Sequence, residues 1–414
     1  MHITNRPVST AIPYVTVMYG MAGLFFSFFV VLVYRFPGFL AAWFTCLGAV
    51  LPMWFYESCR LKKGRNSYEL KPSWSAHALS FMPWLIALCL FSWAYPLFDF
   101  FGGMVTCLVA MLLSFLFNRH VSTDDDLGQI DRYIKNCQKY NFPWQSLRNI
   151  SVKAFFLPLM INFSSNIFDN INGLGLDANL NWYQLLLALM FLVDVSFAAA
   201  GYLPAPKKAA VEIKSSNPYW DAWVAALVCY PPFWLWFSSF FYYKNGLDWS
   251  DYSDYPYYEM VRFLWECALI FLVLVYVWAT VVFGPRFSNL TYRGVVTIGP
   301  YRLMRHPAYV SKNLFWWLAA MPFIPYHGFQ ESVFSTLCLL GISGIYWARS
   351  VTEERHLLSY SDYRRYFRYI LRCGLCFSRV MHYPKKSLRW YLRRYPLIVP
   401  SIFFILAYLV SLFG

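Results

Sequence analysis

The stretch Tyr14–Val33 reads YVTVMYGMAGLFFSFFVVLV and has no charged residue in its 20 positions. A helix of about 20 apolar residues is long enough to cross the hydrocarbon core of a bilayer. A cleavable signal peptide has a shorter apolar region that ends in small residues at a cleavage site, and this stretch has neither feature. It therefore predicts a membrane-spanning helix, and with it the fold class.

The rest of the chain has the same character. The whole chain is 59% hydrophobic, 21% aromatic and only 14% charged, whereas soluble domains are about a quarter charged. We expect an all-α, polytopic transmembrane helix bundle of about eleven spans. The weakest span is 154–170, which polar residues interrupt, and the spans 313–327 and 330–348 predict a short helical hairpin near the C-terminus. The expected spans are 14–33, 38–56, 78–97, 100–117, 154–170, 182–202, 221–241, 263–283, 313–327, 330–348 and 395–413.

The charges predict how these spans are oriented. If the N-terminus is cytoplasmic and the spans alternate, 32 of the 35 Lys and Arg residues fall in cytoplasmic segments and 3 fall outside. Cytoplasmic loops of membrane proteins carry such an excess of basic residues. The net charge of +14 therefore indicates contact with lipid headgroups rather than with nucleic acid. We expect an N-in, C-out protein, in a bacterial inner membrane rather than the endoplasmic reticulum.

Composition divides the chain into four parts. We expect N-terminal transmembrane helices over 1–217, a linking helix with an acidic external loop over 218–260, a core with two polar segments over 261–372, and a basic segment with a final helix over 373–414. Thr123 and Asp126 predict the start of an amphipathic helix at the membrane interface that runs to Tyr140. The acidic run Asp124-Asp125-Asp126 is either a metal site or a solvated helix cap, and we expect the cap. The pair Cys373 and Cys376 lacks the further ligands at suitable spacing that a zinc site needs.

Polar residues concentrate in two cytoplasmic segments that flank the short hairpin. Gly299-Pro300-Tyr301-Arg302-Leu303-Met304-Arg305-His306-Pro307-Ala308-Tyr309 precedes it, and Glu353-Glu354-Arg355-His356-Leu357 with Tyr363-Arg364-Arg365-Tyr366 follows it. Arginine forks match carboxylate or phosphate groups, and acids so close to an apolar span are usually paired or functional. The first segment is either an anion-binding elbow or a basic loop that touches lipid phosphates. The hairpin would bring the two acids back beside His306.

This combination resembles the isoprenylcysteine carboxyl methyltransferase family, which is related to membrane phospholipid methyltransferases. The resemblance covers roughly 261–372 and implies S-adenosylmethionine as the cofactor. The chain departs from the family at Val310-Ser311-Lys312-Asn313, where a glycine is usual, and at Leu371-Arg372-Cys373, where a proline is usual. From the resemblance and the charges together, we expect Arg305, Glu354 and Arg364 to act in catalysis, and Tyr301, Arg302, His306, Pro307, Tyr309, Glu353, Glu354 and Tyr363 to bind the cofactor.

Two other functions fit parts of the sequence. A membrane sterol-type reductase would have a similar elbow but would use NADPH. A non-enzymatic lipid-binding or transport protein would explain the many upstream helices, although they contain few ionisable residues. Asp194 is the main exception, and it would either line an acceptor groove or form a hydrogen bond between helices. For a methyltransferase we expect a lipid or lipid-anchored, anionic acceptor. The sequence does not predict the oligomeric state.

Overall fold

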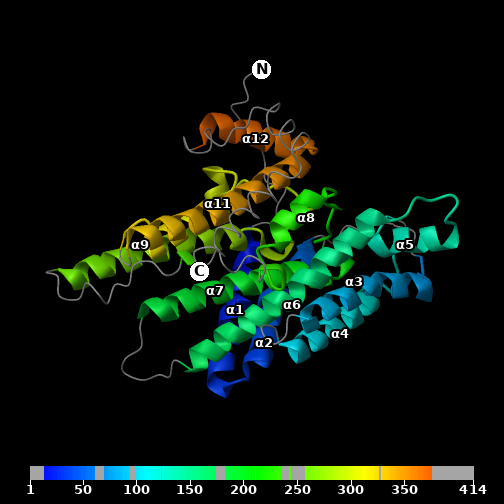
Figure 1. The fold of residues 1–414 in the computed structure, drawn as a ribbon. Helices are drawn as coiled ribbons and strands as arrows, with labels where there is room; N and C mark the ends of the chain where they lie inside the picture. The colour runs from blue at the N-terminus through cyan, green and yellow to red at the C-terminus, as the bar shows by residue number, and fades with distance from the viewer. Residues whose placement is uncertain are drawn as a thin grey trace.

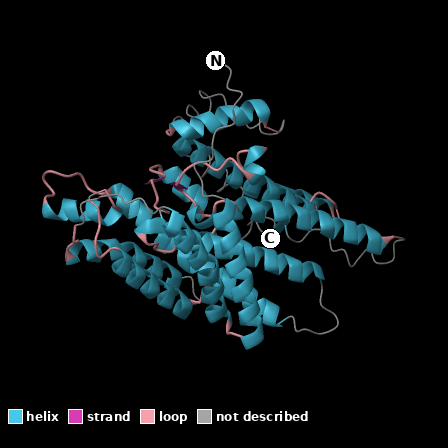
Figure 2. Ribbon diagram, turned by 180° about the vertical axis from the view of Figure 1, so that it is seen from behind, coloured by secondary structure: helices cyan, strands magenta, loops and turns pink. Residues whose placement is uncertain are grey.

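The computed structural model describes residues 14–60, 70–93, 99–122, 124–173, 182–209, 211–234, 242–243, 257–325 and 328–374. Almost all of this part of the chain is helical (Figures 1 and 2). The helices are α1 (Tyr14–Tyr34), α2 (Gly38–Arg60), α3 (Trp74–Trp93), α4 (Phe100–Phe117), α5 (Asp126–Lys135), α6 (Trp144–Gly173), α7 (Trp182–Tyr202), α8 (Trp220–Leu227), α9 (Tyr258–Val281), α10 (Pro307–Ala320), α11 (Phe329–Leu357) and α12 (Ser361–Cys373).

Seven of the described helices are long and apolar enough to cross a membrane. They are α1, α2, α3, α6, α7, α9 and α11, while α4 is apolar but shorter. This supports an integral membrane protein built as a helix bundle. The count of about eleven spans stays a prediction, and the last of them, 395–413, lies outside the described residues, as does Cys376.

The weakest predicted span is part of a continuous helix. α6 runs for 30 residues through Pro158, and the amide oxygen of Asn162 lies 3.3 Å from the backbone nitrogen of Asp99, which donates to it. Asn162, one of the polar residues that weakened the prediction, is therefore used in packing against the start of α4, whereas Asn166 and Asp169 are exposed. A polar group buried between helices needs such a partner.

The predicted span 221–241 is not a continuous helix over its described part. α8 is only 8 residues long and ends at Leu227, and residues 228–234 form turns around Pro231 and Pro232. Two consecutive prolines remove two backbone N–H donors and crowd the preceding turn, so they disfavour a helix here more than the single Pro158 does in α6. The short hairpin is also asymmetric, because α10 has 14 residues and α11 has 29.

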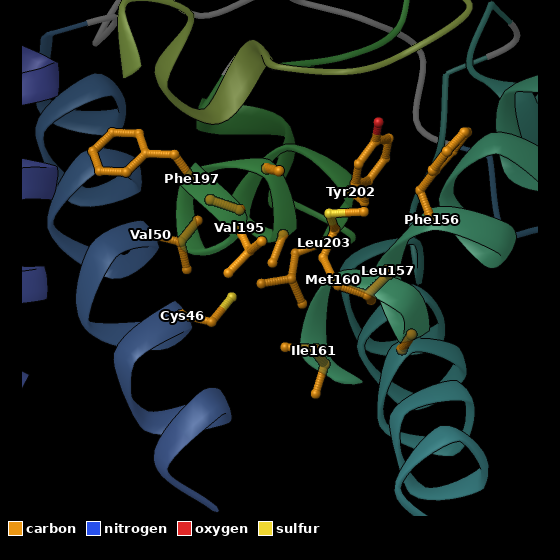
Figure 3. Close-up of a cluster of buried hydrophobic side chains, with 14 of the residues drawn as sticks. Cys46, Val50, Phe156, Leu157, Met160, Ile161, Val195, Phe197, Tyr202 and Leu203 are labelled. Atoms are coloured by element: carbon orange, nitrogen blue, oxygen red, sulfur yellow. The ribbon is translucent and has the colours of Figure 1, made fainter. Parts of the chain in front are cut away.

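One apolar core holds the N-terminal helices together. It is formed mainly by α2, α6 and α7, and its members include Cys46, Phe156, Met160, Phe197 and Tyr202 (Figure 3). Near the end of α7, Gly201 packs directly against the backbone of Phe287. A Cβ at this position would lie 1.9 Å from the Phe287 carbonyl oxygen, so only glycine allows this approach. This close approach joins the N-terminal helices to the predicted catalytic core.

The segments predicted to be cytoplasmic lie together on one face of the molecule. Leu70 pairs with Val121, and the Gln145 amide donates to the Lys214 carbonyl over 2.9 Å. The short strands β1 (Ser215–Ser216) and β2 (Thr291–Tyr292) pair antiparallel, and Ser215 also contacts His356 at the end of α11. These contacts join, in chain order, the segments 57–77, 118–153, 203–220, 284–312 and 349–394.

The predicted interfacial helix is present on this face as α5. Its buried residues include Leu127 and Ile130, and Lys135 pairs with Asp131. The N-cap position is held by Asp125, whose carboxylate accepts a hydrogen bond from the Ser122 backbone, and Thr123 lies outside the described residues. α5 is therefore an amphipathic helix, as predicted, and it is shorter than the expected run to Tyr140.

Candidate functional site

The elbow before α10 is built by a short 3₁₀ turn, Gly299–Arg302. Gly299 has φ +58°, which L side chains rarely adopt, and its Cα faces Trp278 and Val282 closely enough that a Cβ would lie 3.0 Å from the Val282 side chain. Glycine is therefore required on both grounds. Pro307 then opens α10 at its first position, where a missing N–H costs nothing.

α11 brings the two predicted acids to this elbow. The carboxylate of Glu354 lies 2.9 Å from His306 Nε2 and 3.1 Å from Arg305 Nε. The hydroxyl of Tyr309 donates to Glu353 over 2.9 Å, and the rings of His306 and Tyr309 stack at 5.5 Å. The juxtaposition predicted from the hairpin is confirmed by these contacts. Each acid is half-buried and has a hydrogen-bonded partner, which offsets the cost of removing its charge from water.

α12 packs over the same elbow with an aromatic face. Tyr366 donates from its hydroxyl to the carbonyl of Tyr301 over 2.8 Å, and Phe367 lies under the guanidinium of Arg305 at 4.4 Å. Tyr363 is almost fully buried beside them. α12 is therefore fixed to the elbow by both polar and aromatic contacts.

A cavity of about 140 Å³ lies between the elbow, α9, α10 and α11. Its walls are rich in tyrosine, and five arginine or lysine side chains reach it, against one lining carboxylate, that of Glu353. The polar side chains that line it include Tyr230, Tyr276, Asn289, Arg293, Tyr301, Arg305, His306, Tyr309, Lys312, Tyr346, Arg349, Glu353 and Tyr363. A concave site with aromatic walls and a few convergent charged groups is typical of a ligand-binding site.

Most of the predicted site residues reach this cavity. Tyr301, Arg305, His306, Tyr309, Glu353 and Tyr363 line it, and Glu354 supports two of them through its contacts with Arg305 and His306.

Three of the predicted residues are placed elsewhere. Arg302 is exposed, and Pro307 is buried as the first residue of α10. Arg364 donates to the carbonyls of Leu358 and Ser359 at 2.8 and 2.7 Å, where it caps the end of α11. The structure does not bring Arg302, Pro307 or Arg364 into the lining of the cavity.

Four cations that the sequence did not single out as site residues line the cavity, namely Arg286, Arg293, Lys312 and Arg349. Arg349 lies one helical turn before Glu353 on α11, and its guanidinium lies 5.2 Å from the ring centroids of both Tyr309 and Tyr346. Lys312 is on α10, one turn after Ala308. Helical spacing could have identified Arg349, because residues four apart share a face of a helix and Glu353 was already a candidate.

The phenols near the elbow keep their protons at neutral pH. Burial, followed by the nearby carboxylate of Glu353, raises the pKa of Tyr301 well above its usual range. Burial, followed by the carboxylate of Glu354, raises the pKa of Tyr363 in the same way. Burial also lowers the pKa of Arg293 to about 10, which leaves its guanidinium charged at neutral pH. The cavity thus offers phenolic donors and cations together.

Asp194 forms a hydrogen bond between helices, which is one of the two roles considered from the sequence. The hydroxyl of Tyr276 on α9 donates to the Asp194 carboxylate on α7 over 2.6 Å. Tyr276 lines the cavity, whereas Asp194 is not among its lining residues. Asp194 therefore acts on the cavity through Tyr276.

Comparison of the chain with known protein families, with curated proteins and with solved structures finds no match. The function is accordingly inferred from the geometry of the cavity and from the chemistry of its residues.

Proposed function

We propose that the protein is an integral membrane methyltransferase that uses S-adenosylmethionine and acts on a lipid or lipid-anchored, anionic acceptor. One observation carries this proposal: Glu353 and Glu354 meet Arg305, His306 and Tyr309 at the wall of a single aromatic cavity. S-adenosylmethionine has a carboxylate, an ammonium and a sulfonium, and this set of residues contains a partner for each.

The fit can be assigned residue by residue. Glu353 is the lining carboxylate, so it is the partner for the ammonium. Arg305 and His306, both oriented by Glu354, would hold the cofactor carboxylate. The faces of Tyr301, Tyr309 and Tyr363 suit a sulfonium, because aromatic rings attract cations.

When bound, the cofactor supplies an electrophilic methyl group on sulfur. The protein must then exclude water and hold the acceptor in line with that group. An anionic oxygen needs no general base, so we assign proton abstraction to no residue. Arg349 is the cation best placed to hold the acceptor, because it is buried, lines the cavity and, among the described residues, bonds only to the Asn289 amide oxygen, at 3.3 Å, and to Tyr230.

Ligand binding tests this proposal directly. Titration calorimetry on detergent-purified protein should show binding of S-adenosylmethionine, which His306→Ala or Glu354→Ala weakens by at least about tenfold because a charged group loses its partner. Glu259→Gln is the control, since Glu259 is an exposed acid in the first turn of α9. NADPH is the comparison ligand, because the alternative reductase chemistry uses it. Binding of NADPH alone, or equal affinities in all variants, would rule the proposal out.

A further inference from the structure

Lys312 lies in an aromatic box at the side of the cavity. Its ammonium is 5.4 Å from the ring centroid of Tyr276, 5.3 Å from that of Trp316 and 5.7 Å from that of Tyr346. No carboxylate among the described residues lies within ion-pair distance of it. An ammonium carries three donors, so this half-buried lysine has hydrogen-bonding capacity that the rings do not use.

Arg349 lies close to Lys312 and adds a second positive charge. Both cations contact the ring of Tyr346, and both line the cavity. Arg349 also forms no ion pair within the described part of the chain. Like charges so close together in a buried site repel each other unless an anion compensates them.

The carboxylate that acts on Lys312 is that of Asp194, which is not among the residues that line the cavity. Asp194 acts electrostatically on Lys312, but its carboxylate is hydrogen-bonded to Tyr276. Asp194 belongs to α7, one of the helices that precede the region resembling methyltransferases. The N-terminal helices therefore contribute, through Tyr276, to the position of Lys312.

We propose that Lys312 and Arg349 form a subsite for a phosphate monoester, which is part of the acceptor lipid. A phosphate monoester carries about two negative charges at neutral pH and so balances both cations, whereas a carboxylate balances one. Its three terminal oxygens can also accept from the guanidinium and the ammonium together. The assignment to the acceptor depends on the proposed function, whereas the phosphate subsite itself does not.

Short-chain lipids that differ only in their headgroup test the subsite. Dihexanoyl phosphatidic acid and dihexanoyl phosphatidylcholine have the same acyl chains, and only the first has a phosphate monoester. We expect the purified protein to bind the phosphatidic acid at least about tenfold more tightly. Equal binding of the two lipids would overturn the subsite without any variant, so this test holds even if a variant does not fold.

Two substitutions locate the binding at Lys312. Lys312→Met should remove most of the preference for phosphatidic acid, and Lys312→Arg should keep it, because arginine retains the charge but cannot act as a base. A Lys312→Met protein that keeps the preference would also overturn the subsite. The unfolding temperature of each ligand-free variant shows that it is folded.

Two further arms separate the possible outcomes. Inorganic phosphate that binds with the same dependence on Lys312 as the lipid would support the phosphate subsite and would exclude the lipid as its necessary source. S-adenosylmethionine is titrated in parallel, and Lys312→Met should change its affinity by less than about threefold. Lys312-dependent binding of phosphatidic acid without any binding of S-adenosylmethionine would sustain the subsite and remove the proposed function.

Discussion

The guanidinium of Arg349 has an unusual environment for a buried charge. It contacts the rings of Tyr230, Tyr309 and Tyr346, and it pairs with no carboxylate in the described chain. Replacing it with glutamine keeps the length and polarity of the side chain but removes the charge. We expect Arg349→Gln to lower methyl transfer to membrane lipids by at least about 100-fold, because a buried charged contact to the acceptor is lost.

The measurement uses the radiolabelled methyl group of S-adenosylmethionine, native membranes and extraction into organic solvent. Affinity for the cofactor should change by less than about threefold in Arg349→Gln. Arg355→Gln is a matched control, because Arg355 is also on α11 but pairs with Asp221 outside the lining of the cavity. Equal loss in both variants, or none in Arg349→Gln, contradicts this role.

Sequence patterns identified the residues of the elbow better than those of the helices. Arg305, His306 and Tyr309 lie within five positions of one another, so any turn there brings them together. Arg349 and Lys312 belong to long apolar stretches, where charge alone does not say whether a side chain faces a cavity, lipid or water. Arg364 was expected to act in catalysis because of the resemblance and its charge, but its hydrogen bonds are with the end of α11.

At the scale of elements, the hydrogen bonds of Arg364 at the end of α11 should stabilise the folded protein. The last carbonyls of a helix have no partners within it, and Arg364 supplies donors to those of Leu358 and Ser359. We expect Arg364→Ala to destabilise the folded protein by about 1 kcal/mol, seen as a lower unfolding temperature in detergent. Arg365→Ala is the control, because Arg365 is exposed. A loss of lipid methylation in Arg364→Ala at unchanged stability would restore the role first expected for Arg364.

α5 predicts a pH-dependent stability. Burial raises the pKa of Asp126 from 3.8 to about 6, while Lys153 opposes this shift and the Asn149 amide donates to the carboxylate over 2.9 Å. The folded protein therefore binds a proton more tightly than the unfolded chain. The protonated Asp126 carboxyl therefore contributes fully to the stability of the folded protein below about pH 4, and this contribution is lost as the pH rises through about 6.

Asp126→Asn removes this titration. Relative to the unsubstituted protein, the variant should gain about 1 to 3 kcal/mol between about pH 4 and about pH 8. Unfolding temperatures measured across that range test the expectation, with Asp124→Asn as an exposed control on the same turn. Parallel pH profiles for all three proteins would show that Asp126 does not titrate as its burial implies.

The elements themselves were predictable to different degrees. Long apolar runs such as α1 and α7 were confirmed nearly to the residue, because length and apolarity suffice to define them. α8 was overestimated because residues 228–241 are apolar enough for a span, yet Pro231 and Pro232 end the regular hydrogen bonding. Its short length and the extension of α11 to 29 residues depend on tertiary contacts that hydropathy does not contain.

At the scale of the whole molecule, α8 is too short to be the predicted span 221–241. α7 and α9 both end beside the 3₁₀ turn Gly284–Arg286, so they run in the same direction. Eight helical residues span about 12 Å, less than the roughly 30 Å of a hydrocarbon core. A crossing between α7 and α9 is therefore not made by α8 alone, and residues 235–241 of the predicted span lie outside the described residues.

The contacts that join the basic segments predict which face of the protein lies on the cytoplasmic side of the membrane. The described parts of five basic segments share one face, and by the excess of basic residues in cytoplasmic loops that face should be cytoplasmic. An epitope inserted between Gly173 and Trp182, which connect α6 to α7 on the opposite side, should then react with antibody added outside intact cells or spheroplasts. A reporter fused after Gly414 of the full chain should also be active only outside the cytoplasm.

The two positions separate the possible errors. If the epitope is external and the Gly414 reporter is cytoplasmic, the bundle is oriented as expected and the final span 395–413 does not cross. If both signals are cytoplasmic, the whole orientation is inverted, and the cavity beside His306 and Glu353 faces the outside. In that case the proposed chemistry would fail for a reason independent of its residues, because a cavity there would have no supply of a cytoplasmic cofactor.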